Sequence, residues 1–273
     1  MPSNAPRPSK SQQRDDARLK ALAMRAEQDK RARRSRIIAI SGLVAALAVL
    51  AVVVVMILGQ AKPTAEDLDP DNPLLDVSAP AGATDNGGIT VGAGGGAGTT
   101  SPDSTVTVSV YLDYMCPICG QFETANAATL DEMVTAGEIT VEYHPIAILD
   151  RLSQNTEFST RAAQAAAFIA DADPEHFIDF HDGMFANQPE ENTTGLSDEE
   201  IAAIAVEAGV AQATADEIAA DGGAFTTWVT AATAQSSIDG VTGTPTVKIN
   251  GEVTDVDLLT EGPLEEAIRA AIG

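Results

Sequence analysis

The two cysteines of this chain are the residues whose type and spacing most directly predict chemistry. They are the only cysteines in 273 residues, and they stand in the motif Cys116-Pro117-Ile118-Cys119. A structural disulfide stabilises a protein most when it closes a long loop, and this pair closes almost none. Thiols this close together can instead alternate between a dithiol and a disulfide. The spacing therefore favours a redox-active pair. The structural alternative is an inert local disulfide between the two cysteines.

The sequence around the motif predicts that it opens a helix. Valines alternate with Thr and Ser over residues 105–112, which is typical of a strand, and a helical pattern runs from the motif to residue 136. The free N–H groups and the positive end of a helix lower the pKa of a thiol in its first turn. Pro117 fits that turn because its missing N–H costs nothing there. We expect Cys116 to be the exposed, substrate-facing sulfur and Cys119 its buried partner.

A zinc site is the main alternative use of a Cys-x-x-Cys pair. Such a site needs two more ligands, and the chain offers no further cysteine and only His144, His176 and His181. The last two stand five residues apart, so they do not share a helical face. We therefore predict no metal and no cofactor beyond the Cys116–Cys119 disulfide. The histidines are expected to be surface or packing residues.

The remaining elements follow the order of an α/β fold. Residues 139–143 alternate as a second strand, and an Ala-rich helical region covers roughly residues 159–237. Residues 246–249 predict a third strand, which enters a hairpin at Asn250-Gly251. An amphipathic helix over residues 264–272 ends the chain. The predicted order is strand, helix, strand, several helices, hairpin and helix.

Three local patterns divide the helical region. Asp173-Pro174 resembles an N-cap followed by proline in the first turn. Ser197-x-x-Glu200 is a capping-box pattern, and Gly209 can end the helix that it begins. Trp228 is expected to be a packing anchor rather than a ligand contact.

Thr244-Pro245 opens the third strand, where proline is tolerated. If this peptide bond were cis, the backbone before the proline would face outward beside the cysteines. An extended substrate could then pair with that backbone. The sequence by itself does not specify a cis bond, and trans is the default.

The first hundred residues predict a membrane anchor and a tether. Residues 37–58 contain no charged side chain and are long enough to cross a bilayer as a helix. The basic tail 1–36 precedes them, so the positive-inside rule places the N-terminus in the cytoplasm and the bulk of the chain outside. A signal peptide cleaved near Ala61 is the alternative, but its apolar core would be shorter. Residues 59–104, rich in Pro and Gly, are expected to be a flexible linker.

Charge is divided unevenly along the chain. The tail holds 11 Lys or Arg and four Asp or Glu, which gives it a net charge of +7. The remainder carries a net charge of −31, and the two sum to the total of −24. A surface this negative repels phosphate backbones, so nucleic-acid binding is not expected. The simplest role of the charge is solubility.

Together these features resemble the DsbA-type thioredoxin-fold proteins. The resemblance rests on the run Tyr111–Cys119, the helical insert, and Gly243-Thr244-Pro245-Thr246 ahead of the Asn-Gly turn. It is greatest for the membrane-tethered, extracytoplasmic forms of Gram-positive and actinobacterial cells, and it covers about residues 104–273. We accordingly predict a thioredoxin-like domain over residues 105–273, with a helical insertion at about 157–238.

The resemblance also implies a site and an activity. It implies a cis bond at Thr244-Pro245, a nucleophilic Cys116 and a partner Cys119. We expect Pro117, Ile118, Thr244 and Pro245 to contact the substrate. The family introduces disulfides into exported proteins and is re-oxidised by a quinone-linked membrane partner.

Two departures from the family pattern concern the strength of oxidation. Strongly oxidising members have His where Ile118 stands, and an Ile side chain cannot donate a hydrogen bond to the Cys116 sulfur. Many members also have a buried acid at the position of Val110, whereas Asp113 lies nearer, at the expected strand end. A reductase or isomerase on the same fold is therefore an alternative. A non-catalytic interaction ectodomain, which would use the negative charge to recruit a basic partner, is an alternative of another class.

Overall fold

The computed structural model of the protein describes residues 68–220 and 224–273. The predicted basic tail 1–36, the predicted span 37–58 and the first part of the predicted linker, residues 59–67, lie outside the described residues. Among the residues that are described, no helix is both long and apolar enough to cross a membrane.

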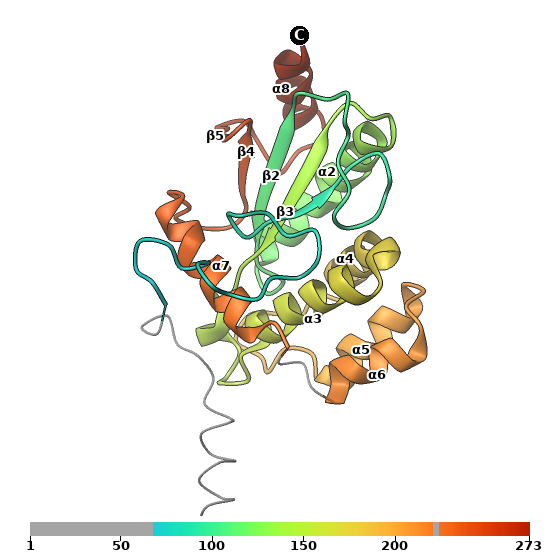
Figure 1. Cartoon of the computed structure of the whole chain (residues 1–273), viewed down its shortest axis with the longest axis vertical. Helices are drawn as coiled ribbons and strands as arrows, with labels where there is room; N and C mark the ends of the chain where they lie inside the picture. Colours follow the sequence, from blue (N-terminus) through green and yellow to red (C-terminus); the bar gives the residue numbers. More distant parts are fainter. Residues whose placement is uncertain (1–67, 221–223) are drawn as a thin grey trace, which may run out of the picture. The chain divides into compact units, whose positions relative to one another are not determined.

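A five-stranded mixed sheet forms the centre of the domain, with the strand order β1-β3-β2-β4-β5 (Figure 1). The strands are β1 (Ile89–Val91), β2 (Thr107–Leu112), β3 (Thr140–Pro145), β4 (Thr246–Ile249) and β5 (Glu252–Val253). Strands β2 and β3 are parallel, and the other pairs are antiparallel. A parallel pair needs a crossover connection, which the helix after β2 supplies.

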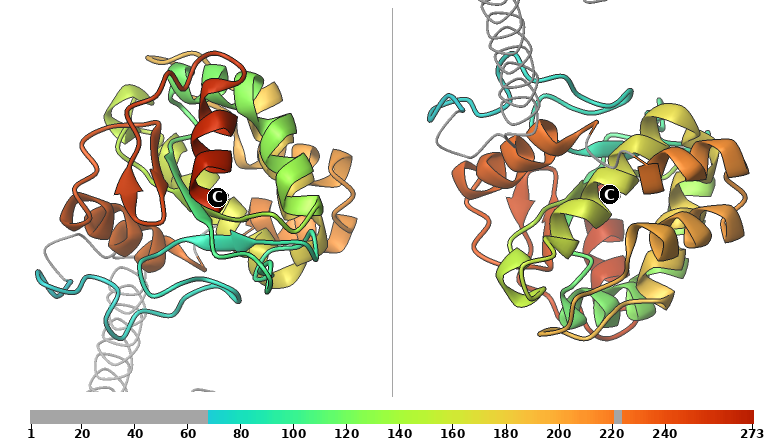
Figure 2. Two further views of the ribbon diagram at one scale, coloured as in Figure 1. Left: turned by 90° about the horizontal axis from the view of Figure 1, so that it is seen from above. Right: turned by 90° about the horizontal axis from the view of Figure 1, so that it is seen from below.

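The helices form two groups. Helices α2 (Pro117–Thr135) and α8 (Pro263–Ile272) contact each other beside the sheet (Figure 2). The others lie between β3 and β4 in sequence, and α3 to α6 gather at one end of the sheet (Figure 1). Their bounds are η2 (Asp150–Leu152), α3 (Phe158–Ala172), η3 (Pro174–His176), α4 (Phe177–Ala186), α5 (Asp198–Glu207), α6 (Gln212–Ala220) and α7 (Thr226–Ile238). The predicted thioredoxin-like α/β fold with a helical insertion is confirmed.

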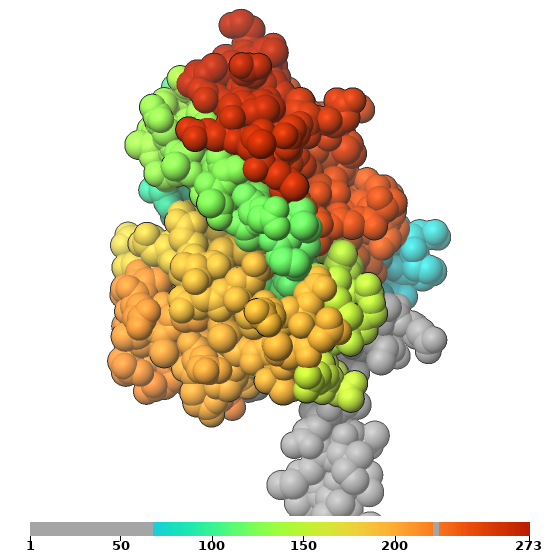
Figure 3. Space-filling model, turned by 180° about the vertical axis from the view of Figure 1, so that it is seen from behind, coloured from blue at the N-terminus to red at the C-terminus, as the bar shows by residue number. Residues whose placement is uncertain are grey.

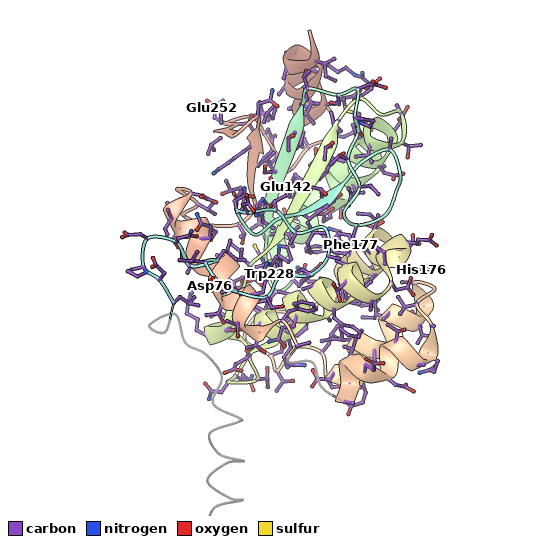
Figure 4. The ribbon with its side chains drawn as sticks, in the orientation of Figure 1. Asp76, Glu142, His176, Phe177, Trp228 and Glu252 are labelled. Carbon is purple, nitrogen blue, oxygen red and sulfur yellow. The ribbon has the colours of Figure 1, made fainter. Side chains whose placement is uncertain are left out.

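Several predicted local signals have their expected structure. Ser197 and Glu200 form both hydrogen bonds of a capping box at the start of α5. Asn250 and Gly251 adopt φ values of 52° and 85°, which a two-residue hairpin turn of this kind requires. Trp228 is fully buried and lies within the domain (Figure 4), as expected of a packing anchor.

The prediction that residues 59–104 form a flexible linker is wrong for residues 68–104. Strand β1 pairs with β3, and the Ser101 hydroxyl donates a 2.6 Å hydrogen bond to the Ile139 carbonyl. The glycine run supports this arrangement because Gly95 and Gly98 both adopt φ 78° and turn the chain back on itself. The glycine-rich composition predicted a flexible tether. In the structure, these glycines instead form a tight turn after β1, which is an edge strand of the sheet.

A test of this correction compares one substitution at a buried and an exposed isoleucine. Ile89 in β1 is fully buried, so Ile89→Val should lower the free energy of unfolding by about 1 kcal/mol. Ile238 is 51% exposed, and Ile238→Val should change it by less than about 0.5 kcal/mol. Urea unfolding of the full chain in mild detergent measures both. Equal effects would mean that residues 68–104 do not pack on the sheet.

The face of the sheet formed by alternate residues of β2 and β3 carries a buried polar network. Ser109 donates a 2.8 Å hydrogen bond to Glu142, and the Glu142 carboxylate lies 3.2 Å from His144 Nε2. The ring of His144 stacks on Tyr111 at 4.0 Å between centroids. Burial acts to raise the pKa of Glu142, but its contacts with His144, Thr84 and Ser109 outweigh burial and lower the pKa to about 2. His144 is buried as a packing residue would be, but it also contacts the Glu142 carboxylate.

Candidate active site

The motif Cys116-Pro117-Ile118-Cys119 lies where β2 gives way to α2. Cys116 occupies the N-cap of α2 with extended backbone angles, φ −78° and ψ 112°, and Pro117 follows in the first turn. Cys119 lies within that first turn, with its backbone N–H donating to the Cys116 carbonyl at 3.0 Å. Both cysteines are free thiols in the structure. The predicted placement of the motif at a helix start is confirmed.

Hydrogen-bond donors around Cys116 favour its thiolate. The pKa of Cys116 is lowered from 9.0 to about 6, and the largest cause is a hydrogen bond with the Cys119 thiol. Burial opposes this effect, while the side chain of Thr244 and the backbone N–H groups of Cys119 and Ile118 add to it. The last two groups belong to the first turn of α2, the positive end of the helix dipole.

Cys119 has the opposite electrostatic environment. It is fully buried, and burial is the largest cause that raises its pKa, followed by the hydrogen bond and charge of Cys116. The two sulfurs therefore differ strongly in acidity, and Cys116 is the one that ionises near neutral pH. The expectation of an exposed Cys116 needs correction, since this residue is only 5% exposed. The two residues between the cysteines, Pro117 and Ile118, are the exposed ones, and Ile118 is 40% exposed.

This difference predicts the pH dependence of alkylation. Thiolates react with iodoacetamide and thiols do not, so the rate should be half-maximal near pH 6 in the full chain, against about 8.5 for a free cysteine. Mass spectrometry at pH 7 should find one modification per chain, at Cys116. A midpoint above pH 8, or equal labelling of Cys119, would contradict the assigned environments.

The backbone at Thr244-Pro245 lies directly against the cysteines. Its peptide bond is cis, as the resemblance implies. The Cys116 thiol donates to the Thr244 carbonyl at 3.4 Å, which joins two segments 128 residues apart. Thr244 and Pro245 are half-buried, while Pro117 and Ile118 are exposed. The structure thus brings all six predicted site residues together.

Asp113 is a buried acid that the sequence placed only at a strand end. It directly follows β2, is fully buried, and accepts hydrogen bonds from the Met115 N–H, the Leu149 N–H and the Ser159 hydroxyl, at 2.9, 2.9 and 2.7 Å. Burial, the largest cause, raises its pKa from 3.8 to about 6, although these hydrogen bonds act in the opposite direction. The backbone of Asp113 also hydrogen-bonds Cys119. The signal in the sequence that could have identified Asp113 as a site residue was its position, three residues before Cys116.

A second buried group connects α2 with the helical insertion. His181 of α4 contacts the Tyr114 hydroxyl at 3.0 Å through Nδ1 and Glu123 Oε1 of α2 at 3.2 Å through Nε2. Among the described residues, Glu123, His181 and the exposed Asp182 also form a group whose ligand atoms lie within 4.8 Å of one another, close enough for a metal ion. This group includes neither cysteine. No sequence pattern identified it, because its members come from separate helices.

The comparisons with known proteins agree with this geometry. A family profile described as Thioredoxin matches residues 97–270, most of the chain, so the chain belongs to this family. Its structure is similar to that of reduced DsbA from Mycobacterium tuberculosis, with a TM-score of 0.52 and 27% identity, over 68% of this chain and 99% of that one. It also shares the fold of MdbA from Actinomyces oris, a thiol-disulfide oxidoreductase, with a TM-score of 0.58 and 21% identity over 77% of this chain and 96% of that one. The predicted resemblance to DsbA-type proteins is confirmed, and the comparisons support the predicted enzyme class.

One curated relative is named as a protein kinase. The serine/threonine-protein kinase PknE of Mycobacterium tuberculosis is 32% identical over 103 residues. That match covers 36% of this chain and 18% of the kinase. The matched segment therefore spans a small part of that protein.

Proposed function

We propose that this protein is a thiol-disulfide oxidoreductase that forms disulfides in exported proteins through Cys116 and Cys119. The observation that carries the proposal is the unequal acidity of the two sulfurs. The Cys116 pKa of about 6 makes this sulfur a good leaving group, since a thiol of lower pKa leaves faster. The raised pKa of Cys119 keeps it protonated in the reduced pair.

The reaction begins from the Cys116–Cys119 disulfide. A substrate thiolate attacks the Cys116 sulfur, the bond between the two cysteines breaks, and its electron pair goes to Cys119, which takes up a proton. The product is a mixed disulfide between substrate and Cys116. A second substrate thiolate then attacks the substrate sulfur, and Cys116 leaves as a thiolate. The substrate gains a disulfide, and its two electrons remain on the enzyme as a dithiol.

Four residues around the sulfurs are proposed to hold the substrate. The exposed side chains of Pro117 and Ile118 offer an apolar surface, and the Thr244-Pro245 backbone offers a place for an extended segment to pair. The Thr244 carbonyl lies 3.4 Å from the Cys116 sulfur, so a segment paired there would lie beside the reacting atom.

The setting of the reaction belongs to the same proposal. Residues 37–58 would anchor the chain with its catalytic domain outside the cytoplasm, where disulfides persist. Re-oxidation of the dithiol requires an acceptor for two electrons, and we propose a quinone-linked membrane partner.

Equilibration of the full chain with glutathione, together with oxidation of a reduced, unfolded protein, tests the proposal. We expect a reduction potential well above the thioredoxin value of about −270 mV, and catalysed disulfide formation. The backbone N–H of Ile118 contacts Cys116 whereas its side chain cannot donate, which favours a less oxidising pair than one with His. A potential near that of thioredoxin would reassign the protein to the reductase direction, and no exchange at all would overturn the enzyme class.

A further inference from the structure

Gln188 is a side chain of the helical insertion that reaches the active-site backbone. It follows α4, and its Nε2 donates hydrogen bonds to the Tyr114 carbonyl at 3.0 Å and to the Cys116 carbonyl at 2.8 Å. A carboxamide nitrogen carries two N–H donors, so the active-site loop uses both. The contact joins the insertion to the redox motif across 72 residues of sequence. Figure 3 shows the surface on which α2, in green, adjoins the insertion, in yellow and orange.

The two carbonyls that Gln188 binds flank Met115. The Met115 N–H is itself held by the Asp113 carboxylate at 2.9 Å. The Cys116 carbonyl additionally accepts from the backbone N–H groups of Cys119 and Gly120, at 3.0 and 3.3 Å. The backbone that turns from β2 into α2 is thus fixed from the helix side and from the insertion side. Cys116 lies at the point where both sets of bonds meet.

Gly120 provides a second, independent observation. It lies inside α2, where glycine is a poor helix former. A β-carbon at this position would overlap Gln188 Oε1, closer than any real contact allows. The atom in its way is the end of a flexible side chain, so an alanine at position 120 would displace the Gln188 amide rather than the backbone. The glycine leaves room for the amide to reach the carbonyls.

We propose that Gln188 is a positioning residue of the redox site: its amide fixes the Tyr114–Cys116 backbone and so aims the Cys116 sulfur at the first turn of α2. This inference rests on the proposed function. The donors that favour the Cys116 thiolate are the Cys119 thiol, the Thr244 side chain and the N–H groups of Cys119 and Ile118. All of them depend on the direction of the Cys116 side chain. Without the amide, the first turn of α2 still holds the Cys116 carbonyl and Thr244 still contacts the Cys116 sulfur, but the Tyr114 and Cys116 carbonyls lose their bonds to Gln188.

The test measures the Cys116 pKa, by alkylation against pH, and the equilibrium constant with glutathione in the full chain. In Gln188→Ala we expect the pKa to rise by about one unit and the dithiol to be disfavoured about fivefold at pH 7. Gly120→Ala should reproduce both changes although alanine is the better helix former. Adding Gly120→Ala to Gln188→Ala should change neither quantity further, since the two act through one amide.

Gln212→Ala is the matched control. The Gln212 amide donates to Asp216 within α6, on the same insertion, and this variant should keep the wild-type pKa and equilibrium constant. A wild-type pKa in Gln188→Ala, or additive effects of the two site variants, would overturn the inference while leaving the proposed function intact. Absence of exchange in the wild-type protein would instead overturn the proposed function.

Discussion

Cys116→Ser is expected to abolish thiol–disulfide exchange by the full chain, with a loss of more than about a thousandfold in the rate of substrate oxidation. Serine keeps the size of the side chain but supplies no sulfur that can form a mixed disulfide. Cys119, the remaining thiol, is fully buried and has a raised pKa, so it cannot take over the reaction. Oxidation of a reduced, unfolded protein substrate, followed by thiol counting, gives the rate.

Cys119→Ser should behave differently from Cys116→Ser. It retains the reactive Cys116, but the enzyme can no longer form its own disulfide. Incubation with a disulfide-containing protein should therefore accumulate a stable mixed disulfide at Cys116, visible on non-reducing gels and reversed by dithiothreitol. The Cys116→Ser protein, carrying the same conservative change at the neighbouring sulfur, should form none.

These two variants also separate an enzyme from an interaction domain. If the cysteines were incidental to a docking role, cells carrying Cys116→Ser would keep every phenotype of the wild type, and no mixed disulfide would form with Cys119→Ser. That combination would remove the basis for the proposed function.

The sequence predicted those parts of the site that are encoded locally. The spacing of Cys116 and Cys119 within one helical turn, the proline in that turn and the Asn250-Gly251 hairpin each depend on a few neighbouring residues. Thr244 and Pro245 were assigned to the site by an argument that required a cis bond and by the resemblance, because no local pattern reveals an approach to Cys116 that spans 128 residues.

The missed residues act through tertiary contacts. Gln188 and His181 belong to the insertion, and nothing in their local sequence shows that they reach Cys116 and Tyr114. The linker prediction failed for a related reason. Glycine and proline content describes the freedom of an isolated chain, whereas residues 89–91 are ordered by pairing with β3, an edge that composition does not reveal.

Asp113 gives the second large prediction, a loss of stability as the pH rises. Its pKa is about 6 in the folded chain and 3.8 when unperturbed, so between these values the folded state binds more protons than the unfolded state. Stability therefore falls as the pH rises from about 4 to 6. The shift of roughly two units corresponds to about 3 kcal/mol at pH 7.

Asp113→Asn removes this ionisation but also one acceptor. The single carbonyl oxygen of the asparagine can accept hydrogen bonds from the Met115 N–H and the Ser159 hydroxyl. Its amide nitrogen would face the Leu149 N–H, and because both groups are donors, no hydrogen bond can form between them. We expect a loss of about 1–3 kcal/mol at pH 4. At pH 7 the variant should be as stable as the wild type or more stable, because only the wild type has to ionise a buried acid.

Urea unfolding of the full chain at pH 4, 5, 6 and 7 measures the difference between the two proteins. Glu142 contributes in the opposite direction, since its pKa of about 2 makes stability fall as the pH drops below about 4.5, but it is present in both proteins and cancels. Asp103→Asn, the same change at an exposed acid, is the control for loss of a carboxylate as such.

A difference between wild type and Asp113→Asn that stays constant over this range would show that Asp113 ionises as readily in the folded chain as in the unfolded one. Burial would then be offset by its three hydrogen bonds, and the acid beside the cysteines would be a fixed charge at every pH at which the Cys116 thiolate exists.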